Sequence, residues 1–77
     1  MKFKRYSKAI YRGEDTMFDS GYELKRNGRY SGTYLVFEDL PNAIGAVLFS
    51  VTSGKVTGQS MKGFWEFRKE WEVPNDF

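Results

Sequence analysis

The sequence contains no cysteine and no histidine. Without cysteine the chain forms no disulfide, thiolate nucleophile or cysteine-ligated zinc or iron–sulfur site. Without histidine there is no Ser-His-Asp triad, and a transition metal would find only poor ligands. We therefore expect no cofactor, no metal site and no catalytic residue of the common hydrolase types.

Long apolar runs are also missing. No segment approaches the roughly 18 apolar residues that a membrane-spanning helix needs. The basic residues Lys2, Lys4 and Arg5 are followed by no apolar stretch of the kind found in signal peptides. Together with the lack of cysteine, which suits a reducing compartment, this predicts a cytoplasmic protein without a membrane partner.

The residues that are present suit a small folded domain. Of the 77 residues, 40% are hydrophobic and 18% are aromatic, which is enough apolar surface to form a core. A chain of this length makes a single domain, here residues 1–77. The net charge is only +2, but its distribution is uneven, because the first twelve residues carry five cations and no acid.

Short turn signals recur along the chain, and the segments between them are rich in Tyr, Phe, Val, Thr and Trp. This pattern predicts an all-β domain, an antiparallel meander of about five to six strands that forms a curled sheet or a small barrel. We expect strands at 3–11, 21–26, 29–37, 45–52, 55–60 and 64–73. The alternative is an α+β fold in which residues 40–50 form one short helix, opened by Asp39 and Pro41.

Three segments give more specific expectations. Asn27-Gly28 favours a type I′ hairpin that joins strands 21–26 and 29–37. The segment 33–37, TYLVF, is apolar on both faces and should lie at the centre of the sheet. In the last strand the alternation places Trp65, Phe67, Trp71 and Val73 on one face, which we expect to pack in the core, with only Lys69 interrupting it.

A pairing of the first two strands would gather the charges at two poles. The start of strand 3–11 would lie beside the end of strand 21–26, because antiparallel strands run in opposite directions. A basic pole would then form, and two tyrosines beside it could stack on the bases of a single-stranded nucleic acid. Its members would be Lys2, Lys4, Arg5, Lys25, Arg26 and Arg29, with Tyr6 and Tyr30. The alternative interpretation is ordinary solvated charge that protects sheet edges.

The opposite pole would be acidic and would collect Glu14, Asp15 and Asp19 with Glu38 and Asp39. The connection that holds the first three also carries the apolar pair Met17 and Phe18. This pair either packs back onto the sheet or anchors a protein partner, and its acidic neighbours would favour a basic partner.

The missing catalytic residues and the predicted charge poles favour a non-enzymatic binding module. We expect a protein or ribonucleoprotein partner, as for the accessory and inhibitory proteins of phages and mobile elements. An alternative is a β-barrel that binds RNA or single-stranded DNA through the basic pole. A third hypothesis is a histidine-free ribonuclease that uses Lys, Arg, Tyr or Glu in catalysis.

Overall fold

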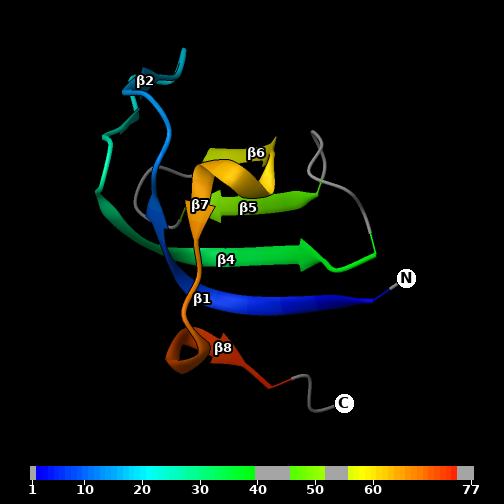
Figure 1. The fold of residues 1–77 in the computed structure, drawn as a ribbon. Helices are drawn as coiled ribbons and strands as arrows, with labels where there is room; N and C mark the ends of the chain where they lie inside the picture. Colours follow the sequence, from blue (N-terminus) through cyan, green and yellow to red (C-terminus); the bar gives the residue numbers. More distant parts are fainter. Residues whose placement is uncertain (1, 40–45, 52–55, 75–77) are drawn as a thin grey trace.

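The computed structural model describes residues 2–39, 46–51 and 56–74 (Figure 1). These residues form short and medium strands with two 3-10 turns, and no longer helix occurs among them, so the all-β prediction is confirmed. The elements are β1 Phe3–Tyr11, β2 Thr16–Met17, β3 Glu23–Leu24, β4 Arg29–Phe37, β5 Val47–Val51, β6 Val56–Ser60, η1 Lys62–Phe64, β7 Trp65–Glu66, η2 Lys69–Trp71 and β8 Glu72–Val73.

The alternative of a short helix at residues 40–50 is wrong for residues 47–50, which belong to a strand. Residues 47–51 form the strand β5, in which the β-branched Val47 and Val51 are completely buried. Residues 40–45 lie outside the described ranges.

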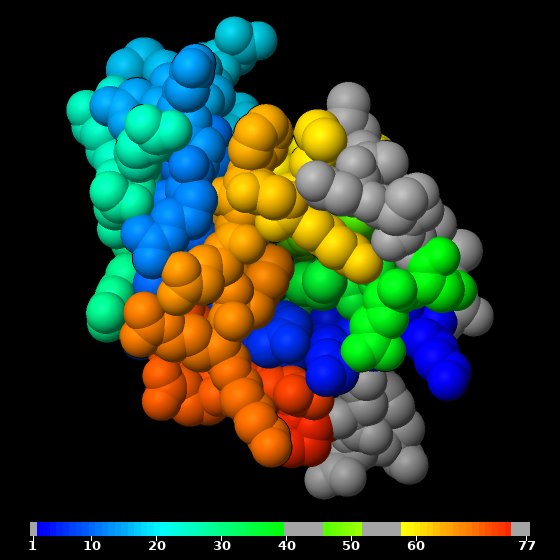
Figure 2. Space-filling view, in the orientation of Figure 1, coloured from blue at the N-terminus to red at the C-terminus, as the bar shows by residue number. Residues whose placement is uncertain are grey.

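A six-stranded antiparallel sheet makes up most of the molecule. Its order is β6-β5-β4-β1-β7, and β8 pairs with β1 along the same edge as β7. The sheet curls, but its described strands do not close into a barrel. The short strands β2 and β3 form a separate two-stranded arm. In the space-filling view, the chain from β7 to β8, orange to red, lies on the surface beside the blue residues of β1 (Figure 2).

The core lies on one face of the sheet and is largely aromatic. Tyr34 of the central strand β4 is completely buried and stacks on Phe49 of β5 at a centroid distance of 6.3 Å. Trp65 contacts both rings and donates its indole N–H to Ser60 Oγ at 2.9 Å. The central position predicted for the segment 33–37 is therefore confirmed, since β4 lies between β1 and β5.

The predicted hairpin at Asn27-Gly28 is wrong. β3 pairs with β2, and β4 pairs with β1 from Phe3↔Phe37 to Ile10↔Arg29. A positive φ occurs at Asn27 but not at Gly28, whereas a type I′ turn needs it at both positions. The Asn27 N–H instead bonds to the Tyr11 carbonyl at 2.6 Å, which ties the turn to β1. The nine-residue β1 occupies this edge of β4 and forms a longer ladder than residues 21–26 could.

The predicted strand 64–73 is interrupted. β7 and β8 both pair with β1, at Ile10↔Glu66 and Arg5↔Val73, but more residues lie between the two paired stretches in this segment than in β1. The surplus residues leave the ladder and form the 3-10 turn η2. Phe67 packs against the core as expected, whereas Trp71 does not belong to the core cluster.

Candidate anion-binding site

Trp71 lies among three cations at the edge of the sheet. The charged groups of Arg68, Lys8 and Arg29 lie 5.4, 5.8 and 6.0 Å from the centre of its indole ring. The face of an indole ring is electronegative and attracts cations at such distances. The half-buried ring therefore gathers three positive side chains that would otherwise repel one another.

Different elements supply the members of this group. Lys8 comes from the middle of β1, Arg29 begins β4, and Arg68 immediately precedes η2. Arg29 pairs with Ile10, two residues beyond Lys8 in β1, so Lys8 and Arg29 lie on the same face of the sheet. The Ser7 hydroxyl donates to the Trp71 carbonyl at 3.4 Å, which links η2 to β1.

A carboxylate neutralises part of this charge. Glu66 accepts from Arg12 Nη2 at 2.6 Å and from Arg68 Nε at 3.1 Å. The hydrogen bond from Arg12, and then that from Arg68, lowers the pKa of Glu66. Arg12 also donates to Asn27 Oδ1 at 2.7 Å, which fixes its guanidinium against the β3–β4 turn.

Lys8 and Arg29 form no ion pair with any carboxylate in the described part of the chain. We use the name Trp71 cluster for Lys8, Arg12, Arg29, Glu66, Arg68 and Trp71. It combines four cations with a single carboxylate, so its charge is strongly positive. Such a site can bind a phosphate or a carboxylate group, because charge-assisted hydrogen bonds to arginine and lysine are the strong ones.

The predicted basic pole does not form. β1 pairs with β4 rather than with residues 21–26, so Lys2, Lys4 and Arg5 lie at one end of β1, whereas Lys25, Arg26 and Arg29 lie toward the other. Lys4 pairs with Glu38 at 3.5 Å, and the negative charge of Glu72, followed by Tyr6 and Glu38, raises the pKa of Lys4. Of the six predicted cations, Arg29 alone belongs to the Trp71 cluster.

The two predicted stacking tyrosines pack inward. Tyr6 lies against Phe67 with their ring centroids 4.7 Å apart. The Tyr30 hydroxyl accepts a hydrogen bond from the Lys25 backbone N–H at 2.6 Å, and its ring contacts Tyr22. Both rings are half-buried against the core, so neither flanks a basic pole.

The predicted acidic pole does not form either, because the pairing of β1 with β4 separates its members. Glu14, Asp15 and Asp19 lie in and beside the β2–β3 arm, far along β1 from Glu38 and Asp39, which follow β4. Asp15 accepts from the Arg26 backbone N–H at 2.8 Å and lies 3.8 Å from the Lys25 ammonium, so its charge is locally balanced.

The apolar pair in the β2–β3 arm separates into an inner and an outer residue. Phe18 packs against the core, which is the first of the two alternatives predicted for the pair, packing onto the sheet. Met17 is 66% exposed, and such exposure is what the second alternative, an anchor for a protein partner, would need. The arm therefore presents one large apolar side chain to solvent.

The sequence alone did not predict a common site for Lys8, Arg12, Arg68 and Trp71. Lys8 and Arg12 had been noticed only as part of a basic N-terminal segment. The signal that could have revealed the rest is Lys69, which interrupts the apolar alternation at the place where the strand breaks and Trp71 turns outward.

Two further properties concern the chemistry of the described ranges 2–39, 46–51 and 56–74. They contain no group of three or more acidic side chains arranged to hold a metal ion. They also contain no helix long and apolar enough to cross a bilayer.

Comparison with protein-family models, with curated proteins and with solved structures finds no significant match.

Proposed function

We propose that the protein is a non-enzymatic binding module whose partner is single-stranded nucleic acid, either free or within a ribonucleoprotein. The observation that carries this proposal is the presence of Lys8 and Arg29 beside Trp71, with no carboxylate partner among residues 2–39, 46–51 and 56–74. Two cations that an aromatic ring holds side by side form a preorganised phosphate site.

The position of the cluster supports a chain-like ligand rather than a single ion. Lys8 lies in β1 and Arg12 directly follows this strand, four residues further on, a separation of about 13 Å along an extended chain. Arg29 begins β4 and Arg68 follows β7, on the two sides of β1, so the positive charge also extends across the strands. A phosphate backbone that follows this surface contacts several cations, and a base beside it can contact the partly exposed Trp71.

The test is the salt dependence of binding to a fluorescently labelled single-stranded RNA, measured by anisotropy between about 50 and 200 mM salt. Three phosphate contacts predict a log–log slope of about −2, because each contact on a single strand contributes about −0.7. The double variant Lys8→Gln/Arg29→Gln should bind at least about ten-fold more weakly and give a slope about 1.4 units shallower.

The matched control is Lys2→Gln/Lys25→Gln, which removes two positive charges outside the cluster. Equal loss of affinity in both double variants would contradict the proposal, since it would show that only total charge matters. The labelled RNA should also be recovered at full length, because the proposed function includes no cleavage. Cleavage by the purified protein would instead support the ribonuclease hypothesis.

A protein partner is the second candidate, and the exposure of Met17 favours it. A flexible, polarizable methionine is a good anchor for a partner surface. The full chain and its Met17→Lys variant should be compared as affinity baits after nuclease treatment. A stoichiometric protein that the wild type retains and the variant loses would support this candidate. Equal retention by both would contradict a role for Met17.

A further inference from the structure

A cleft of about 560 Å³ lies beside the Trp71 cluster. It is bounded by the connection between β1 and β2, the β3–β4 turn and the 3-10 turn η1, and its walls include Tyr11, Arg12, Arg26 and Phe64. This volume falls within the range of small-molecule sites, about 300–1,000 Å³. A single nucleotide is an appropriate occupant by size.

The walls of the cleft combine an exposed aromatic ring with an available cation. Phe64 is 45% exposed, which is unusual for so large an apolar side chain. Arg26 uses its backbone N–H to bond Asp15, but its guanidinium contacts no carboxylate in the parts of the chain that the structure describes. An aromatic face can stack on a base, and a guanidinium can bind the attached phosphate.

Hydrogen bonds hold the two sides of the cleft in position. The Arg12 backbone N–H donates to the Phe64 carbonyl at 2.6 Å, so η1 is tied directly to the end of β1. The Tyr11 hydroxyl donates to the Glu14 carbonyl at 2.8 Å and lies 3.3 Å from Thr16 Oγ1. The cleft is therefore formed before a ligand arrives, which lowers the entropy cost of binding.

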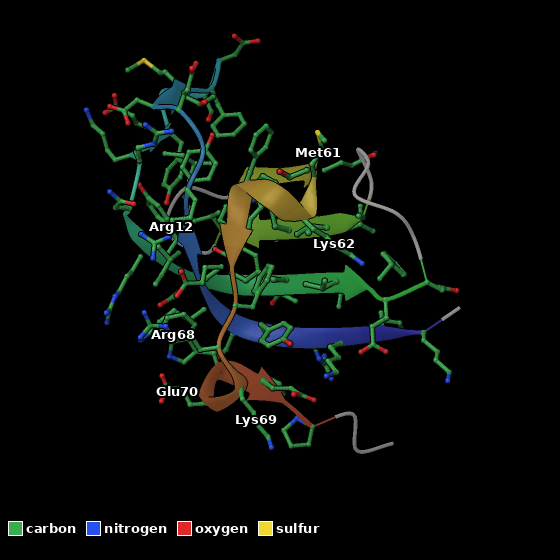
Figure 3. The ribbon with its side chains drawn as sticks, in the orientation of Figure 1. Arg12, Met61, Lys62, Arg68, Lys69 and Glu70 are labelled. Atoms are coloured by element: carbon green, nitrogen blue, oxygen red, sulfur yellow. The ribbon has the colours of Figure 1, made fainter. Side chains whose placement is uncertain are left out.

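The cleft is continuous with the Trp71 cluster through Arg12. This residue lines the cleft, and its guanidinium shares Glu66 with Arg68, which in turn contacts Trp71. Figure 3 shows Arg12 and Arg68 on the same side of the molecule, Arg12 from the end of β1 and Arg68 from the chain that follows β7. A strand bound at Trp71 can thus reach the cleft through Arg12. The lining of the cleft itself holds one carboxylate, Glu14, beside the cations Arg12 and Arg26.

We propose that this cleft is a subsite for one nucleotide of the bound strand, with the base stacked on Phe64 and the phosphate bound by Arg26. The inference deepens the proposed function and depends on it for the identity of the strand. It assigns separate tasks to the two regions: the Trp71 cluster binds the phosphate backbone, and the cleft holds one base.

The first test uses adenosine and uridine monophosphates as probes, titrated into the isotope-labelled full chain and followed by NMR. We expect concentration-dependent shifts of the backbone amides at positions 12–14, 26 and 63–64. Phe64→Leu should weaken mononucleotide binding about five- to ten-fold, as expected for the loss of one stacked base. The matched control Phe3→Leu changes an exposed phenylalanine at the other end of β1 and should leave these shifts unchanged.

A second measurement separates failure of the subsite from failure of the proposed function. If the wild type binds single-stranded RNA and Phe64→Leu binds it equally well, the strand does not use the cleft and the inference is wrong. If the wild type binds no RNA, the proposed function fails and the inference fails with it. Mononucleotide shifts that appear only around Trp71, or nowhere, would also overturn the assignment of the cleft.

Discussion

At the scale of single residues, Glu66 limits the positive charge of the Trp71 cluster. It is the carboxylate that both Arg12 and Arg68 contact, and their hydrogen bonds to it lower its pKa. Glu66→Gln should release both guanidinium groups for phosphate binding. We expect the affinity for single-stranded RNA to rise several-fold and the salt slope to become steeper by up to about 0.7.

The measurement for Glu66→Gln is the same anisotropy titration, with Glu23→Gln as the control, because Glu23 pairs with Lys25 outside the cluster. The free energy of unfolding should change little, since the ion pairs of Glu66 lie at the surface, where such pairs contribute little to stability. Unchanged affinity would mean that Arg12 and Arg68 do not contact the ligand.

Tyr34 should make stability depend on alkaline pH. Burial is the main cause that raises the pKa of its phenol, and the neighbouring Tyr22 and Tyr30 raise it further. A raised folded-state pKa means that the neutral phenol stabilises the fold fully below about pH 10, the unfolded value. This stability is lost progressively as the pH rises above that value.

Tyr34→Phe should reduce this loss. The variant removes the hydrogen bond from the Tyr34 hydroxyl to the Tyr30 carbonyl, at 3.2 Å, and should cost about 1 kcal/mol at pH 8. Between pH 9 and 11 its free energy of unfolding, measured with urea, should fall less steeply than that of the wild type. Parallel pH profiles for the two proteins would show that Tyr34 ionises as easily in the folded state as in the unfolded state.

At the scale of elements, Gly32 allows β4 and β5 to approach closely. A Cβ atom at this position would collide with the backbone carbonyl oxygen of Ser50. The register between β1 and β4 also shifts near Gly32, opposite the stretch of β1 between Tyr6 and Lys8. The structure therefore gives a steric reason for a glycine at position 32.

Gly32→Ala should therefore destabilise the protein by about 1–3 kcal/mol, the usual cost of forcing an extra carbon into a packed site. Ser31→Ala on the same strand is the control and should change stability by less than about 0.5 kcal/mol, because Ser31 is exposed. Equal effects in a denaturant titration would show that the close approach of β4 and β5 contributes nothing.

The elements themselves were largely predictable, but their partners were not. β1 and β4 were predicted with the correct ends, because alternation and β-branched or aromatic residues define a strand locally. Strand pairing depends on contacts between residues that are distant in the sequence. The local signal at Asn27-Gly28 favoured pairing of β4 with the segment just before it, whereas in the structure β4 pairs with β1. The break at η2 follows from a length mismatch with β1, which becomes visible only when the pairing is known.

At the scale of the whole molecule, the error in pairing also changed the predicted site. Of the predicted cations only Arg29 belongs to the Trp71 cluster, because the predicted grouping followed the wrong register. Trp71 was expected in the core with Trp65 because both fit a continuous alternation. In the structure Trp65 is 7% exposed within the core, whereas Trp71 lies among Lys8, Arg29 and Arg68. The site could not be predicted without the register that brings β1, β4 and η2 together.

The two tryptophans therefore provide the most direct test of the proposed binding function. Trp65→Ala should lower the free energy of unfolding by about 3–5 kcal/mol, as expected for a buried aromatic residue. Trp71→Ala should lower it by less than about 2 kcal/mol, because a half-buried ring loses less packing. The decisive measurement is the affinity of folded Trp71→Ala for single-stranded RNA, with urea unfolding recorded on the same sample. We predict at least about ten-fold weaker binding with the fold retained. Wild-type affinity in a folded Trp71→Ala protein would contradict the proposal that this cluster forms the binding surface.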